Sequence, residues 1–409
     1  MKHFPMMLIA RVKISVLFLA AVGLSFICRA EQPVQAAALD QLVAAAEKSH
    51  TDALVIWQDG KPLGEWYFGK PVEPLEAMSA TKSVVSLAIG KLITDGKIKS
   101  LDQPVWEFYP EWRQGRKKNV TLRHLLNHTS GLQNFPRTDV EIYASPDYVQ
   151  LALAAEMDAD PGATFRYNNK AVNLLAGIVQ KASGRRLDLY LRDELFAPLG
   201  ITNFTWKLDS AGNPQVMSGL QILPADFAKL GQLALNRGRW EGRQLIADGW
   251  FDVSMRPAQE HNPFSGLLWW LKFDRVSYVI DDERITELET RAASTPSAPA
   301  DFAARAGKLK GRYKDTDALY QAMDKAFGQE WPYDSLLAEL PVPQPGKVIA
   351  WYADGSLGQQ LVVVPGANLV AVRMISSRSD YNPKTDSFDN FRQMVLKLVT
   401  PVTLLETKK

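Results

Sequence analysis

The sequence predicts an α+β protein in which both ends of the chain contribute to one antiparallel sheet, flanked by helices, with a mainly helical region inserted. Three observations indicate this fold. Strand-like runs lie near the beginning of the chain, helix-period segments fill its middle, and strand-like runs return near its end. Strands at both ends with helices between them imply a single sheet.

Residues 1–30 resemble a secretory signal peptide. A basic start, an apolar run and a small residue follow one another as Lys2, Arg11, Lys13, Ile14–Ile27 and Ala30. The apolar run is too short to span a bilayer comfortably, although an uncleaved anchor is an alternative. A lipoprotein modified at Cys28 is a weaker one, because Phe26 and Ile27 are bulky where small residues are usual.

Cleavage after Ala30 leaves residues 31–409 as one domain and directs it across the inner membrane, to the periplasm. It removes Cys28, the only cysteine, and changes the net charge from +2 to −2. We therefore expect no disulfide and no thiol chemistry. We also expect no nucleic-acid partner and no membrane association after cleavage.

The first elements of the mature chain are a helix and a hairpin. Leu39–Lys48 has helical periodicity, and two strand-like runs follow at Ala53–Gln58 and Leu63–Phe68. Asp59-Gly60 between the runs is a hairpin signal. An apolar helix then begins after Ser79 and stops near residues 95–96.

From about residue 101 to 250 the chain is predicted to be helix and loop. Its helix candidates are Thr121–Asn127, Pro146–Ala155, Lys170–Ala182, Asp188–Phe196 and Ala225–Asn236. The segment from about 284 to 345 is rich in Pro, Ser and Ala and contains mixed helical pieces, which indicates a surface insertion. The closing elements are predicted as strands and a helix at Val348–Ala353, Gln360–Val364, Leu369–Ile375 and Phe388–Leu398.

Ser79-Ala80-Thr81-Lys82 stands where a loop gives way to the apolar helix. A serine and a lysine three residues apart share one helix face, so Lys82 can take the proton of Ser79. Free N–H groups of the first turn can steady an anion formed beside them.

Two further segments carry polar chemistry. Tyr167 and Asn169 offer a phenol that moves protons and an amide that holds a polar substrate group. A lysine ammonium beside the phenol would favour the phenolate. The Gly-rich stretch Ala353–Gln359 permits close backbone approach, so the N–H of Ser356 can join that of Ser79 as an oxyanion hole.

In this order, these segments resemble the serine β-lactamase and penicillin-binding-protein superfamily, in its class C and esterase-like branch. The phrase Thr121–Leu132, TLRHLLNHTSGL, closely resembles the "TxRxLLxHTSGL" signature of that branch. The resemblance covers about residues 50–275 and 347–400. It implies a β-lactamase/transpeptidase-like fold.

The resemblance implies that Ser79 is the acylated nucleophile and that Lys82 and Tyr167 are its acid/base partners. It places Asn169 in the substrate cleft, with Asp354 and Gly355 nearby on a strand. The expected substrate is a small ester or amide, and neither a metal nor an organic cofactor is implied.

One departure concerns the position of Ala353. β-Lactamases and transpeptidases usually carry Lys or His there, and a lysine helps to bind a substrate carboxylate. Here Ala353 is followed by Asp354, which would repel that anion and could pair with an amine-bearing substrate. Lys384-Thr385-Asp386 lacks the glycine of the family motif and lies after the strands. The departure favours an esterase or amidase similar to 6-aminohexanoate dimer hydrolases.

Other interpretations stay open. His124 and His128, four residues apart, would share a helix face as zinc ligands do, but the family phrase favours structural roles. Trp269-Trp270 is typical of a core more than of a stacking platform. The alternative functions are a D,D-peptidase or β-lactamase, and a non-catalytic peptidoglycan-binding protein of the same fold.

Overall fold

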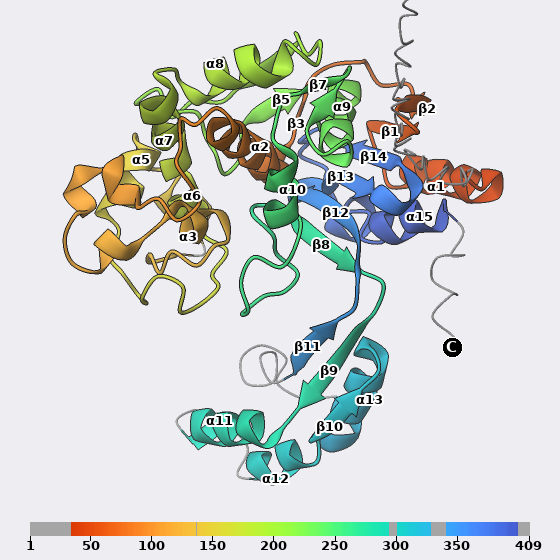
Figure 1. Cartoon of the computed structure of the whole chain (residues 1–409). Helices are drawn as coiled ribbons and strands as arrows, with labels where there is room; N and C mark the ends of the chain where they lie inside the picture. The colour runs from red at the N-terminus through yellow and green to blue at the C-terminus, as the bar shows by residue number, and fades with distance from the viewer. Residues whose placement is uncertain (1–33, 136, 294–300, 329–340, 400–409) are drawn as a thin grey trace, which may run out of the picture. The chain divides into compact units, whose positions relative to one another are not determined.

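A six-stranded antiparallel sheet organises the protein (Figure 1). The computed structural model describes residues 34–135, 137–293, 301–328 and 341–399, so the predicted signal peptide lies outside the described residues. The strand order is β2-β1-β14-β13-β12-β8. The strands are β1 (Ala53–Gln58), β2 (Lys61–Trp66), β8 (Trp270–Phe273), β12 (Val348–Gly355), β13 (Gln359–Val364) and β14 (Leu369–Met374). The prediction of one sheet built from both ends is confirmed.

The hairpin between β1 and β2 has the geometry that its sequence predicts. Asp59 and Gly60 have φ angles of 52° and 77°. Positive φ at both central residues defines the type I′ turn, whose twist matches that of the flanking strands.

Side chains alternate between the two faces of the sheet. Val55 and Val372 belong to a large core shared with α2 (Thr81–Thr94) and α9 (Pro224–Leu235). Ile56 and Ala371 point to the other face and pack with α1 (Ala36–Lys48) and α15 (Phe391–Lys397). Because both faces are covered there, the inner strands β1, β13 and β14 read as nearly continuous apolar runs, whereas the edge strand β2 is largely exposed.

The helix α2 is buried on almost every side. Its buried positions include polar ones, Lys82, Ser83 and Ser86, besides the apolar residues that the pattern indicates. A helix that is buried all round lies inside the protein rather than on its surface. The prediction that this helix follows Ser79 and stops near Asp95 is confirmed.

Short helices build most of the region between the two ends of the sheet. They are α3 (Leu122–Leu126), α4 (Thr138–Glu141), α5 (Tyr148–Ala154), α6 (Asn169–Val172), α7 (Leu174–Ser183), α8 (Leu187–Leu191) and α10 (Asp248–Ser254). The predicted helix Lys170–Ala182 is divided at Asn173, whose side-chain amide donates to the Asn169 carbonyl. The predicted helix Asp188–Phe196 is α8 followed by a π-helical segment, Arg192–Phe196.

Small sheets and a last short helix complete the main part. One sheet has the order β3-β5-β4, and a two-stranded sheet pairs β6 with β7. These elements are β3 (Leu75–Glu76), β4 (Phe204–Trp206), β5 (Leu220–Ile222), β6 (Arg239–Trp240), β7 (Arg243–Gln244) and α14 (Pro383–Asp386).

The insertion contains a sheet that the sequence pattern did not indicate. Its elements are β9 (Val276–Ile280), α11 (Asp282–Ala293), α12 (Phe302–Gly307), β10 (Gly311–Tyr313), α13 (Thr316–Phe327) and β11 (Val342–Pro345). The strands pair in the order β10-β9-β11, and Ile280, Phe302 and Leu319 contribute to a separate core. The inserted structure therefore begins at Val276, upstream of the predicted boundary. Its strands are short and find their partners far along the chain, which local periodicity cannot reveal.

No helix among the described residues has the length and apolar character needed to cross a membrane.

Candidate active site

Ser79 lies in a short 3₁₀ turn, Met78–Ala80, that leads directly into α2. Met78 has a φ of 49°, in the left-handed region that a residue with a β-carbon rarely adopts. Ser79 is partly exposed, whereas Lys82, one turn further on, is buried. The start of the helix thus presents the hydroxyl to solvent and keeps the amine inside.

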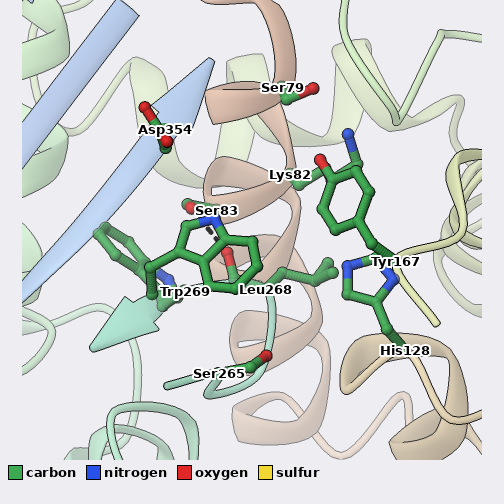
Figure 2. Close-up of a pocket in the computed structure, with 10 residues that line it drawn as sticks. Ser79, Lys82, Ser83, His128, Tyr167, Ser265, Leu268, Trp269 and Asp354 are labelled. Atoms are coloured by element: carbon green, nitrogen blue, oxygen red, sulfur yellow. Dashed lines mark hydrogen bonds between the residues drawn. The ribbon is translucent and has the colours of Figure 1, made fainter. Parts of the chain in front are cut away.

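One pocket gathers Ser79, Lys82 and Tyr167 from distant parts of the chain. Figure 2 shows the Ser79 hydroxyl, the Lys82 amine and the Tyr167 phenol directed toward one another. The remaining lining residues are Ser83, His128, Ser265, Leu268, Trp269, Trp270 and Asp354.

Lys82 sits in surroundings that favour its neutral form. Its Nζ donates to the carbonyl of Met217 at 2.6 Å and lies 4.9 Å from the centroid of the Tyr167 ring. Burial lowers the pKa of Lys82 well below its ordinary value, because desolvation penalises the ammonium. The acceptor is held in place by Asn173, whose side-chain oxygen accepts from the N–H groups of Val216 and Met217 at 2.9 and 3.2 Å.

Tyr167 also favours its neutral form. Burial raises the pKa of Tyr167 to about 12; a hydrogen bond with Ser79 opposes this shift, and the charge of Asp354 adds to it. The expected phenolate depends on a charged lysine, and the lowered pKa of Lys82 does not favour that charge. Burial acts on both groups, and it disfavours the charged state of each.

The ring of Tyr167 is fixed by its neighbours. It lies 4.6 Å from the His128 ring and stacks on Trp270 at 6.0 Å, measured between ring centroids. The next residue, Asn168, caps α6 by accepting from the Ala171 N–H at 2.9 Å. Its own N–H donates to His128 Nδ1 at 3.2 Å. Burial lowers the pKa of His128 to about 3, so this imidazole is a neutral acceptor at neutral pH.

The two histidines of the signature phrase have structural roles. His124 completes a capping box with Thr121 at the start of α3. Helix α3 ends at Leu126 and His128 has a φ of 59°, so the two residues do not share a helix face as the spacing suggested. The described residues contain no cluster of side chains suited to hold a metal ion.

The end of β12 packs directly against the turn that carries Ser79. A β-carbon at Gly355 would lie 2.4 Å from the Ala77 carbonyl oxygen and 3.1 Å from the Met78 β-carbon, so only glycine fits there without a shift. Ser356 follows at once, in the turn Ser356–Gly358 between β12 and β13. The proposed second oxyanion donor, Ser356, is thus the residue that follows this close contact, although it is not among the pocket-lining residues.

Asp354 lines the pocket, as the sequence predicts. Its Oδ2 forms an ion pair with Arg392 Nη1 on α15 at 3.3 Å. Burial raises the pKa of Asp354, and the nearby Arg392 opposes that shift. The preceding Ala353 is fully buried on the α2 side of the sheet, where it offers only a methyl group.

The structure places some of the predicted residues differently from what the sequence suggested. Asn169 is not among the pocket-lining residues, and its side-chain amide donates to Thr138 Oγ1 at 3.3 Å. Trp269 is buried, as expected for a core residue, but both Trp269 and Trp270 line the pocket. The aromatic pair itself was the only signal for them in the sequence. The triplet from Lys384 belongs to α14, so the prediction that it is not the strand motif is confirmed.

Fold and site together define a protein of the β-lactamase and penicillin-binding-protein type. The chain belongs to the beta-lactamase family, whose model matches residues 39–390.

Named relatives resemble only parts of the chain. The 6-aminohexanoate-dimer hydrolase of Paenarthrobacter ureafaciens is 24% identical over 52% of this chain and 59% of its own length. Esterase EstB of Burkholderia gladioli is 25% identical over 36% of this chain and 43% of its own length. The chain thus spans well under two thirds of these relatives.

A solved structure described as a putative 6-aminohexanoate-dimer hydrolase from Bacillus anthracis has a similar fold. It superposes with a TM-score of 0.61 at 18% identity, covering 87% of this chain and 81% of that one.

Proposed function

We propose that this protein is a serine hydrolase that cleaves a small ester or amide through an acyl-enzyme on Ser79. One observation carries the proposal. A partly exposed serine shares its pocket with a buried lysine of strongly lowered pKa and with a neutral tyrosine. This combination supplies a nucleophile, a base and an acid, and burial disfavours the charged forms of both Lys82 and Tyr167.

The proton inventory follows from these states. Neutral Lys82 accepts the Ser79 proton as Oγ attacks the substrate carbonyl, and the N–H groups of Ser79 and Ser356 hold the oxyanion. The neutral phenol of Tyr167 then donates its proton to the leaving oxygen or nitrogen and is reprotonated from Lys82. Water attacks the acyl group in the second half-reaction, with the same groups acting in reverse.

The charge of the pocket bears on the substrate. Ala353 stands where a cationic residue would help to bind a carboxylate, and the next residue, Asp354, lines the pocket with Arg392 as its ion-pair partner. The function that fits is therefore an esterase or amidase for neutral or amine-bearing substrates. The names of two relatives, a 6-aminohexanoate-dimer hydrolase and the esterase EstB, support the esterase or amidase part of this proposal.

We also propose that the protein acts in the periplasm, because residues 1–30 resemble a cleaved signal peptide. The mass of the protein isolated from the periplasmic fraction tests this. A mature chain beginning near Glu31 is expected, and a full-length chain retained in the cytoplasm would contradict it.

A fluorophosphonate probe tests the hydrolase directly. Mass spectrometry of the treated protein should place the label on Ser79, and Ser79→Ala should lose both the label and turnover of a p-nitrophenyl ester. Ser86→Ala is the matched control, since Ser86 is a buried serine of the helix that follows Ser79 and does not line the pocket. An unlabelled wild-type protein would favour the peptidoglycan-binding alternative. Release of terminal D-alanine from a muropeptide, with esters as poorer substrates, would favour the D,D-peptidase.

A further inference from the structure

Arg373 on β14 is a fully buried arginine that the proposed chemistry does not use. Its neighbours Val372 and Met374 pack on the α2 side of the sheet, so its own side chain points to the opposite face. There its guanidinium lies 6.0 Å from the Phe388 ring centroid. Arg373 therefore sits behind the sheet, away from the substrate pocket.

Every N–H group of this guanidinium has an acceptor. Nε donates to Thr51 Oγ1 at 2.9 Å, and Nη2 donates to the carbonyls of Ser49 and Asp386 at 3.2 and 2.5 Å. Nη1 donates to the carbonyls of Leu357 and Gly358 at 2.8 and 2.9 Å. A guanidinium has five N–H groups in a rigid fork, so this set saturates it.

The two acceptors of Nη1 belong to the turn that follows β12. Leu357 has a φ of 67°, a left-handed conformation that is unfavourable for a residue with a β-carbon. Gly358 has a φ of 87°, and a β-carbon there would lie 2.3 Å from Arg373 Nη1. The guanidinium thus packs closely against a turn with an unfavourable backbone conformation at Leu357, and that conformation directs the two carbonyl groups toward Arg373.

The same turn carries the N–H of Ser356. The other end of the turn is tied down by Gln359, whose side chain accepts from the Ile375 N–H at 3.0 Å and donates to its carbonyl at 2.6 Å. Ser356 is therefore the first residue of a turn whose next two carbonyl groups, those of Leu357 and Gly358, both accept hydrogen bonds from Arg373.

We propose that Arg373 is a positioning residue that holds the Ser356–Gly358 turn in the conformation in which the Ser356 N–H completes the oxyanion hole. The proposal rests on the proposed function. It predicts that weakening the guanidinium clamp lowers the rate of chemistry and leaves ground-state binding of substrate nearly unchanged.

Arg373→Lys is the principal test, because lysine keeps the charge but cannot bridge the five acceptors. We expect kcat for a p-nitrophenyl ester to fall about 10- to 100-fold with KM changed less than about threefold, and fluorophosphonate labelling of Ser79 to slow in parallel. Arg378→Lys is the matched control. Arg378 Nη2 bonds the Asp386 carboxylate and its Nη1 the His50 carbonyl, so the variant perturbs the same region without touching the turn.

A milder variant covers the case in which Arg373→Lys does not fold. Thr51→Val removes the acceptor of Nε and leaves the guanidinium buried, so a smaller loss in kcat at constant KM is expected. Unchanged kcat and labelling rate in whichever variant folds would overturn the proposal, as would an equal loss in the Arg378→Lys control. If wild-type Ser79 is not labelled at all, the proposed function fails instead, so the two failures are distinguishable.

Discussion

Gly355→Ala tests whether the close approach of β12 to the Ser79 turn is needed for catalysis. The added β-carbon would lie 2.4 Å from the Ala77 carbonyl oxygen, a backbone atom that cannot rotate away. Reaching even the 3.0 Å limit requires a relative shift of about 0.6 Å between β12 and the turn. Misplacement by about 1 Å can cost about 100-fold in rate, so we expect kcat to fall about 10- to 100-fold.

The assay is steady-state hydrolysis of a p-nitrophenyl ester, with unfolding measured in parallel to show that the variant is folded. Gly366→Ala is the control, since Gly366 lies in another turn of the same sheet and a β-carbon there meets no atom within 4 Å. A Gly355→Ala protein that keeps kcat within about threefold of wild type would refute the argument that this contact aligns the oxyanion hole.

Three further predictions follow from charges and their burial. The value of kcat/KM should rise with pH as Lys82 loses its proton and should stay level to at least pH 10, because the pKa of Tyr167 is raised to about 12; a falling limb near neutrality would contradict this. Two matched p-nitrophenyl esters, one ending in an ammonium and one in a carboxylate, test Asp354→Asn. The ratio of their kcat/KM values should shift about two- to fivefold toward the anionic ester, a modest change because the Asp354 carboxylate is partly exposed. An unchanged ratio would show that Asp354 does not contribute to substrate selectivity. Lys170→Met should lower the free energy of unfolding in urea by about 2–4 kcal/mol, because Lys170 is buried and bonds Glu141 at 2.5 Å. Adding Glu141→Leu should recover part of that loss. Equal stability of the wild type, the single variant and the double variant would show that the two residues are not coupled.

The elements that could be predicted from the sequence are those whose signals are local. The strand β1 and the Asp59-Gly60 turn were predictable because an apolar run and a turn dipeptide stand side by side in the chain. The partnership of Ser79 and Lys82 was predictable because residues three positions apart on a helix lie on the same face. Tyr167 required the family resemblance, since no spacing rule links it to either residue.

The protonation states of Lys82 and Tyr167 could not be predicted from the sequence in the same way. A lysine beside a tyrosine indicates a stabilised phenolate only if the lysine is charged, and burial decides that. Lys82 is 3% exposed, a quantity set by residues from many parts of the chain. The role of Arg373 was hidden for a related reason, since its partner Thr51 lies 322 residues away in sequence.

The register of β12 connects the chemistry to the specificity. Successive side chains of a strand point to opposite faces, so Ala353 and Gly355 face α2 and the Ser79 turn while Asp354 points toward Arg392 on α15. A shift by one residue would place the carboxylate on the α2 face near Lys82, where an opposite charge would favour the ammonium and remove the base. In the observed register Asp354 pairs with Gln360 on β13, and Ala353 pairs with Leu361. The same register leaves Asp354 at the pocket wall, and we expect the proposed preference against anionic substrates to follow from that position.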